Sequence, residues 1–223
     1  MSRLCLILFG PPGSGKGTQA KLLRQSLAVP HISTGDMLRE RMEHLDELGS
    51  QVAEMLRSGG LVPDETVNVM VEDRIAQPDC GKGFILDGYP RTVNQAAILS
   101  GLLESHNVAA TLVYLKVDYN VIMARLAGRR QCPACGTLFS HSAGAPTGPE
   151  VCDHDGAQLV IREDDRQEVV AERLKAYHRQ TAPVLEYFKS AGVPVWEVDG
   201  ASPEGPQGIA RRVRSLIEEK LVS

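Results

Sequence analysis

Runs of consecutive apolar residues recur along the 223-residue chain, separated by segments with a different pattern. Such runs occur at 4–9, 83–87, 111–117 and 193–198, and a shorter extended piece lies at 29–32. Strands that are apolar at nearly every position are typical of a parallel sheet with both faces covered. These runs therefore predict the buried strands of a parallel sheet.

The segments between these runs carry helical periodicity or residues that start and end helices. The stretch 33–36 holds three N-cap residue types, so a helix is expected from there to about Glu47, and Gly49 with Ser50 is expected to break it. Further helices are expected at 19–28, 51–57, 64–76, around Leu99, and at 119–127, 165–189 (kinked at Pro183) and 207–221. Strands that alternate with helices predict an α/β fold with a parallel sheet flanked by helices.

One stretch, 128–165, has no helical period and carries paired cysteines, glycines and prolines, so it is expected to form a separate small module. Elsewhere, Gly10, Ser33, Asp87 and Asp118 each follow a strand-like run. Because ligands in parallel sheets bind beyond the carboxyl ends of the strands, these residues are expected at one crevice.

A glycine-rich loop of sequence GPPGSGKGT follows the first apolar run and precedes the first helix. Gly10, Gly15 and Lys16 match the spacing of a phosphate-binding loop, in which backbone N–H groups and a lysine surround an anion. The position after the lysine is commonly Ser or Thr, whereas here Gly17 precedes Thr18. An ordinary glycine-rich turn is the alternative, but a strand before the loop and a helix after it favour phosphate binding.

Several charged residues are expected beside the same crevice. Arg125 and Arg129 share a helix face, where they repel unless an anion lies between them, and Arg173 lies on an otherwise apolar stripe. Solvated or carboxylate-paired arginines are the alternative to anion binding. Asp87 ends a buried strand and is expected to hold magnesium or its waters, the alternative being a turn residue. Asp164 and Asp165 are interpreted as helix-capping charge.

A metal site is indicated by two half-sites separated by 16 residues. Cys132 and Cys135 form the first half, and Cys152 forms the second with either Asp155, which keeps the two-residue spacing, or His154. Thiolates at this spacing are typical of structural zinc, although reactive or disulfide-bonded cysteines are the alternative.

The overall charge limits the partners. With 24 basic and 28 acidic residues the net charge is −4, which argues against a large nucleic-acid surface. The longest apolar run, 4–9, is too short to span a membrane or form a signal peptide, and clustered cysteines suit a reducing compartment. A cytoplasmic protein is therefore expected.

Taken together, these stretches resemble the adenylate kinases, a family of nucleoside monophosphate kinases, and the resemblance covers nearly the whole chain. In that family Gly followed by Thr replaces the usual Ser or Thr of the loop, as Gly17 and Thr18 do here. The stretches that carry the resemblance are 10–19, 33–39, 87–91 with Gln95, Arg125 with 128–130, 162–165 and Arg173.

The resemblance implies a role for each matching residue. The residues implied to bind ATP are Gly13, Ser14, Gly15, Lys16, Gly17, Thr18, Arg125, which stacks on the base, and Arg129. The residues implied to bind AMP are Thr34, Arg39, Gly60, Val62, Gly88, Arg91, Gln95, Arg162 and Arg173, with Gln95 reading the adenine edge. The residues implied in catalysis are Lys16, Asp87, Arg91, Arg129, Arg162 and Arg173.

The family further implies a P-loop NTPase-like core at 1–32, 63–127 and 166–223, a helical AMP-binding insert at 33–62 and a zinc-bearing lid at 128–165. The implied reaction is ATP + AMP ⇌ 2 ADP, with magnesium, by in-line transfer in a monomer. One stretch departs from the family: 139–147 lacks the usual aromatic-His pair and Asn-Pro-Pro of the lid.

Two alternatives remain open from the sequence. A kinase for another nucleoside monophosphate would keep the same motifs, although Thr34 and Gln95 favour adenine. A non-catalytic nucleotide-binding switch or zinc-ribbon adaptor is disfavoured by the number of arginines and the lack of an Asn-Lys-x-Asp motif.

Overall fold

The computed structural model describes residues 3–44, 46–140 and 150–222. Among these residues, five parallel strands form the central sheet in the order β2-β3-β1-β4-β7. The strands are β1 (Arg3–Phe9), β2 (His31–Ser33), β3 (Gly83–Asp87), β4 (Val108–Lys116) and β7 (Val195–Asp199). The predicted α/β fold with a parallel sheet is confirmed.

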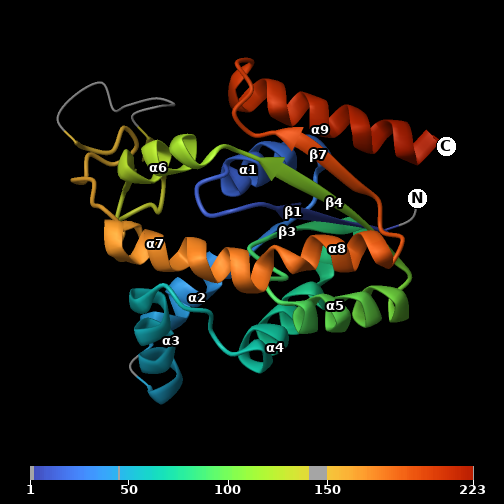
Figure 1. Ribbon diagram of the computed structural model, residues 1–223, viewed down its shortest axis with the longest axis horizontal. Coiled ribbons are helices and arrows are strands. Elements are labelled where there is room, and N and C mark those ends of the chain that lie inside the picture. The colour runs from blue at the N-terminus through green and yellow to red at the C-terminus, as the bar shows by residue number, and fades with distance from the viewer. Residues whose placement is uncertain (1–2, 45, 141–149, 223) are drawn as a thin grey trace.

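Alternation along β1 shows why helices cover both faces of the sheet (Figure 1). Leu6 and Leu8 face the layer formed by α1 (Lys16–Leu27) and α9 (Gly205–Val222). Cys5, Ile7 and Phe9 face the opposite layer, formed by α4, α5 and α8. The helices of that layer are α4 (Asp64–Ile75), α5 (Val93–Ser105) and α8 (Pro183–Ser190). Every residue of the strand from Cys5 onward is therefore buried, as its uniform apolar pattern predicts.

The helices α2 (Thr34–Met42) and α3 (Glu47–Ser58) form a small insert between β2 and α4. The expected break at Gly49 and Ser50 is wrong, because both residues lie inside α3. The helix starts earlier because the Asp46 carboxylate caps it, accepting a hydrogen bond of 2.8 Å from the Gly49 N–H. Gly49 serves close packing instead, since a Cβ there would lie 2.1 Å from the His44 carbonyl oxygen.

The expected long helix at 165–189 is divided. It consists of α7 (Gln167–Ala176), a π-helical turn (Tyr177–Thr181) and α8. The irregularity precedes Pro183: the Ala182 N–H donates to the Tyr177 carbonyl over five residues, and Pro183 then starts α8 where no N–H is needed.

The segment 128–165 follows α6 (Tyr119–Ala127) and lies beside α7 (Figure 1). Its described part holds the antiparallel pair β5 (Arg129–Gln131) and β6 (Leu138–Ser140), a bridge from Gln131 to Val160, and a 3-10 turn (Glu163–Asp165). Cys132, Cys152 and Leu159 form a small core of their own, separate from the two cores of the sheet. No α-helix lies in this described part, and the division of the chain into domains stays a prediction.

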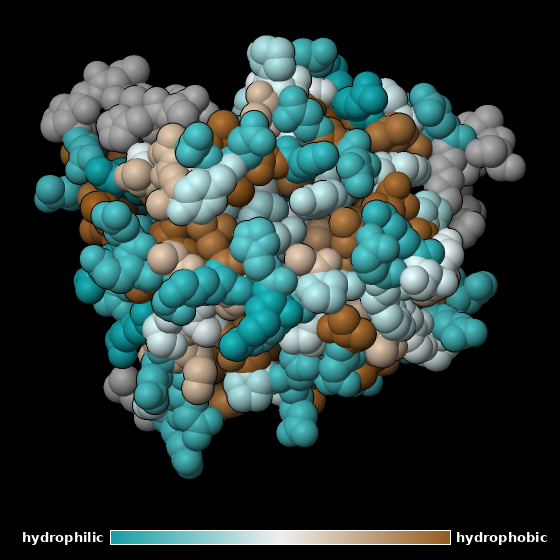
Figure 2. All heavy atoms as spheres, viewed as in Figure 1, coloured by the Kyte–Doolittle hydropathy of each residue, from teal (hydrophilic) through white to brown (hydrophobic). Residues whose placement is uncertain are grey.

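The surface is mixed in character. On the face seen in Figure 2, hydrophilic and hydrophobic side chains are interspersed. Across the described residues, no helix combines the length and the apolar character needed to cross a lipid bilayer.

Candidate active site

The carboxyl ends of three strands meet at one edge of the sheet. Pairing places Asp87 of β3 opposite Leu8 of β1 on one side and opposite Ser33 of β2 on the other. Beyond this edge lies a cavity of about 520 Å³ whose lining includes Gly10, Ser33 and Asp87. Asp118, expected at the same crevice, is exposed and does not line it, because it serves as the N-cap of α6.

The glycine-rich loop forms one wall of this cavity. Gly10 has a φ of +146°, and a Cβ there would lie 2.8 Å from the Leu115 carbonyl oxygen, so the turn requires glycine. Gly15, with a φ of +99°, is the N-cap of α1, whose first residue is Lys16. The loop residues Gly13, Ser14, Gly15, Lys16, Gly17 and Thr18 all line the cavity, as expected. The free N–H groups at the start of α1 therefore face a space large enough for an anion.

Lys16 folds back over its own loop. Its ammonium group donates to the carbonyl oxygens of Gly10 at 2.7 Å and Pro11 at 2.9 Å. Burial, together with the nearby charges of Arg91, Arg173 and Arg129 and against the opposing Asp87 carboxylate, lowers the pKa of Lys16 to about 7. An anion bound beside this ammonium group would favour its charged form.

Five arginine side chains from four segments surround the same cavity. Arg39 comes from α2, Arg91 follows β3, Arg129 and Arg162 come from the two ends of segment 128–165, and Arg173 comes from α7. Every arginine that the sequence placed at the phosphates is therefore brought to this cavity. Because the segments are far apart in the sequence, only the fold creates this concentration of positive charge.

The arginines are desolvated as well as crowded. Burial lowers the pKa of Arg91 to about 10, with the charge of Arg173 adding to the effect. Burial likewise lowers the pKa of Arg162 to about 10, helped by Arg39 and Arg129. Positive charges held together away from water are stabilised by a polyanion, so the cavity is electrostatically suited to phosphate.

Carboxylates partner these arginines in the described structure. Arg173 contacts Asp164 and Asp165, each at 3.1 Å, and Asp165 also lies 3.4 Å from Arg129. Asp36 contacts Arg39 at 2.5 Å. The interpretation of Asp164 and Asp165 as helix-capping charge is wrong, because Arg166 is the N-cap of α7 and both carboxylates turn toward the arginines. Local sequence could not reveal partners that lie 8 to 36 residues away.

A second, smaller cavity adjoins the first and shares Gly88 and Arg91 with it. Its lining includes the expected residues Thr34, Gly60, Val62 and Gln95, together with Leu38, Leu56 and Val67. Its volume is about 10 Å³, the space of a single water molecule. In this conformation the cavity is too small to hold a nucleotide base.

Arg125 also lines the large cavity. Its guanidinium donates to the carbonyl oxygens of Gly200 at 2.8 Å and Ser14 at 3.3 Å. These bonds hold the guanidinium beside the glycine-rich loop, at a point where a planar base could lie against it.

Asp87 has a neighbour that the sequence pattern did not single out. The His31 Nε2 atom lies 3.3 Å from the Asp87 Oδ2 atom, because β2 pairs with β3. Gly17 leaves room for this carboxylate, since a Cβ there would lie 3.3 Å from Oδ2. A carboxylate beside the phosphate loop fits the oxygen ligands that magnesium prefers. Only strand pairing brings His31 there, and periodicity alone gives no such signal.

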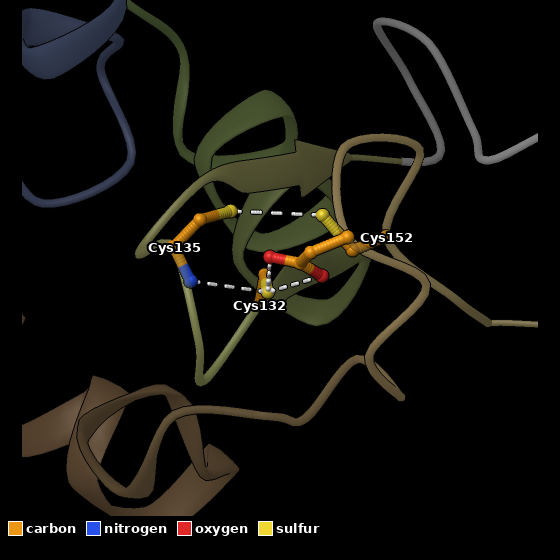
Figure 3. Close-up of side chains that lie close together, drawn as sticks. Cys132, Cys135 and Cys152 are labelled. Atoms are coloured by element: carbon orange, nitrogen blue, oxygen red, sulfur yellow. Dashed lines mark hydrogen bonds between the residues drawn. The ribbon is translucent and has the colours of Figure 1, made fainter.

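The cysteines gather in segment 128–165 (Figure 3). Ligand atoms of Cys132, Cys135, Cys152 and Asp155 all lie within 4.8 Å of one another, and the Sγ atoms of Cys135 and Cys152 are 3.6 Å apart. Tetrahedral zinc with bonds of about 2.3 Å would separate two sulfurs by about 3.8 Å, so these residues fit the ion. Asp155, rather than His154, joins the three thiols in this group. All five cysteines are described, and none forms a disulfide.

The departure from the family pattern at 139–147 falls mostly outside the described residues, which leave out 141–149.

Known proteins were compared with this sequence. The family model for adenylate kinase matches residues 8–193. The chain belongs to the adenylate kinase family.

Relatives named adenylate kinase extend this match over most of the chain. The relative from Anaeromyxobacter dehalogenans is 45% identical over 213 residues, which cover 94% of this chain and 99% of that protein. The relative from Pseudothermotoga lettingae is 47% identical over 191 residues, covering 85% and 88%. The relative from Thermotoga neapolitana is 45% identical over 197 residues, covering 87% and 89%.

Membership of the adenylate kinase family confirms the predicted resemblance and makes this protein a phosphotransferase. The family supports nucleotide binding and phosphoryl transfer to a nucleoside monophosphate. The roles of individual residues and the division into core, insert and lid stay predictions.

Proposed function

We propose that this protein catalyses the reversible transfer of a phosphoryl group from ATP to AMP, giving two ADP. The observation that carries the proposal is the shape of the site. A phosphate loop and five arginines face one cavity, and a smaller apolar cavity containing Thr34 and Gln95 opens beside it. A single nucleotide would use the loop but not the second cavity, whereas two nucleotides meeting at their phosphates would use both.

The donor nucleotide is proposed to bind along the loop. Backbone N–H groups from Gly13 to Thr18 and the Lys16 ammonium would hold the ATP phosphates. The Arg125 guanidinium, which is fixed by the Gly200 and Ser14 carbonyls, would stack on the base.

The acceptor nucleotide is proposed to bind between α2 and the turn after β3. Arg39 and Arg91 would hold the AMP phosphate, while Thr34, Gly60, Val62, Gly88 and Gln95 surround the base. The Arg91 guanidinium is already oriented by a 2.7 Å hydrogen bond from its Nε to the Gly88 carbonyl.

The transfer step is proposed to proceed in line, without a covalent enzyme intermediate. Lys16, Arg129, Arg162 and Arg173 would neutralise the negative charge that spreads over the phosphoryl oxygens during transfer. Desolvation strengthens these interactions, and closing the insert and lid over the cavity would exclude water that could hydrolyse ATP.

Magnesium would be held with the ATP phosphates, with Asp87 binding the ion or its waters. When bound, the ion neutralises phosphate charge and fixes the geometry of the donor. Zinc would be held by Cys132, Cys135, Cys152 and Asp155 in the proposed lid, 128–165, where it stabilises the fold and takes no part in the chemistry.

The proposed core comprises 1–32, 63–127 and 166–223, and the proposed AMP-binding insert comprises 33–62. We further propose a monomer that works in the cytoplasm, a compartment consistent with the five free thiols.

The test is a coupled assay with ATP and each of AMP, GMP, CMP and UMP. Phosphorylation of AMP in clear preference to the other three is expected, and preference for another base would contradict the proposal. Lys16→Met is expected to lower kcat at least 100-fold, because it removes a charge that acts on the transferring group. Lys82→Met, which changes an exposed lysine that lines neither cavity, serves as the control.

A further inference from the structure

The side-chain amide of Gln95 is held at both ends. Its Oε1 atom accepts a hydrogen bond of 2.7 Å from the backbone N–H of Arg91, and its Nε2 atom donates one of 2.8 Å to the Asp64 carboxylate. The Gln95 side chain belongs to α5 and is buried. Two partners from different segments therefore fix one side chain at the wall of the smaller cavity.

The chemistry of these partners permits one orientation of the amide. A backbone N–H can only donate, and an ionised carboxylate can only accept. Turning the amide by 180° would set the Gln95 NH2 against the Arg91 N–H and its oxygen against the Asp64 oxygen. Both contacts would become repulsive, so the order of oxygen and nitrogen along the cavity wall is fixed.

Asp64 is itself fixed. Its Oδ2 atom accepts hydrogen bonds from the Thr92 hydroxyl at 2.7 Å and from the Asn94 amide at 3.0 Å. Asp64 is the first residue of α4, and Thr92 caps α5 by accepting from the Gln95 N–H. Three side-chain donors thus converge on this one carboxyl group, whose oxygens accept all three hydrogen bonds.

One N–H and one oxygen lone pair of the Gln95 amide remain for a ligand. The lining of the cavity also includes the apolar side chains of Leu38, Val62 and Val67, which suit the faces of a base. A 6-aminopurine offers a donor at position 6 and an acceptor at N1. The Gln95 oxygen can accept from the 6-amino group while the Gln95 N–H donates to N1. A 6-oxopurine offers an acceptor at position 6 and a donor at N1, and it would match only the turned amide.

We infer that Asp64 is a specificity-determining positioning residue, which fixes the Gln95 amide in the orientation that accepts a 6-aminopurine and rejects a 6-oxopurine. The inference rests on the proposed binding of AMP in the smaller cavity. A carboxylate outside the nucleotide-contacting set thus controls which base the contacting residue can read.

The experiment compares AMP with IMP, which differ at position 6 and N1 alone. Asp64→Ala removes the acceptor, and Asp64→Asn keeps the shape while adding a donor that can face the turned Gln95. For each, kcat/KM is measured for both monophosphates with ATP, and the dissociation constants of AMP and IMP are measured by calorimetry without ATP. Thermal unfolding shows whether each variant folds. If one Asp64 variant does not fold, the inference is tested with the other variant alone.

In both variants the ratio of kcat/KM for AMP to that for IMP is expected to fall about tenfold, because one charge-assisted hydrogen bond no longer opposes the turned amide. The dissociation constant of IMP divided by that of AMP is expected to fall by the same factor. Asn94→Ala removes another bond to Asp64 but leaves Gln95 held, so its ratio is expected to match the wild type. An unchanged ratio in a folded Asp64 variant, or an equal loss for AMP and IMP, would overturn the inference. Failure of the wild type to phosphorylate AMP would instead refute the proposed function.

Discussion

The ammonium group of Lys16 lies 2.7 Å from the carbonyl oxygen of Gly10, the residue that begins its own loop. Two carbonyl oxygens thus hold the lysine in place, while burial lowers its pKa to about 7. In the unfolded chain this pKa is near 10.5, so the folded protein binds fewer protons between these values. Lys16 therefore makes a contribution to the unfolding free energy that rises with pH from about 7 to 10.5.

Binding of ATP is expected to reverse this shift, because phosphate favours the charged ammonium. At pH 8 we expect a net uptake of up to one proton for each ATP bound without metal, since pH 8 lies above the pKa of about 7 that Lys16 has in the folded protein. Calorimetry in buffers of different ionisation enthalpy measures this number. Lys16→Met should abolish the uptake at saturating ATP, and a wild-type protein that takes up no proton at pH 8 would contradict the prediction.

Asp165 is expected to be essential for stability. Its side chain is fully buried between Arg129 and Arg173, so Asp165→Ala removes the carboxylate that lies between them and leaves Arg173 with Asp164. The free energy of unfolding should fall by roughly 3–5 kcal/mol, as when one partner of a buried ion pair is removed. Denaturant unfolding measures the change.

The control for Asp165 is Glu172→Ala, which breaks an exposed pair with Lys175 and should cost less than about 1 kcal/mol. Because phosphate can replace the missing carboxylate, ATP should stabilise Asp165→Ala more than it stabilises the wild type. Equal stability of the two variants would show that the arginines need no anionic partner.

The cysteine group is expected to bind about one zinc ion per chain. Asp155→Ala should lower the zinc content and the thermal stability, whereas His154→Ala should keep the metal, because Asp155 alone of the two lies with the thiols. Elemental analysis of both purified variants checks the ligand. Loss of zinc in His154→Ala with retention in Asp155→Ala would assign the fourth position to histidine. Removal of zinc should lower the melting temperature before it lowers kcat for the remaining folded protein.

Two glycines are expected to respond oppositely to alanine. At Gly10 the φ of +146° and the Leu115 carbonyl 2.8 Å from a Cβ predict that Gly10→Ala destabilises the fold by about 2 kcal/mol or more. Gly101 lies inside α5 with nothing within 4 Å of a Cβ, so Gly101→Ala should stabilise it by about 0.5–1 kcal/mol. Thermal or denaturant unfolding of the pair gives both values, and a stabilising Gly10→Ala would show that the loop is not tightly constrained.

Sequence pattern predicted the parts of the fold that depend on local or periodic information. Uniformly apolar runs located the main strands, and α6 was expected at 119–127, where it is found. Prediction failed at two places where a local hydrogen bond sets a helix boundary or changes the helix type. The Asp46 cap moves the start of α3 ahead of Gly49, and a π-helical turn interrupts the helix before Pro183.

The residues of the candidate site also fall into those that the sequence predicted and those that it did not. Its loop and arginines could be found because phosphate binding constrains residue type and spacing. Asp64, Asp164 and Asp165 could not, because their roles depend on partners brought together from other segments. His31 likewise reaches Asp87 only through the pairing of β2 with β3. The residues expected to contact the ligand could be recognised by a sequence motif, whereas the residues that orient those side chains could not.

The carboxylates of Asp36, Asp164 and Asp165 already occupy the arginines in the described structure. Phosphate that enters the cavity must therefore displace an existing partner, and binding becomes an exchange of anions rather than the neutralisation of bare charge. The net affinity is the difference between two sets of ion pairs, which keeps it moderate despite five arginines. The reverse exchange assists departure of a bound phosphate, because Arg39, Arg129 and Arg173 regain carboxylate partners as the phosphate leaves.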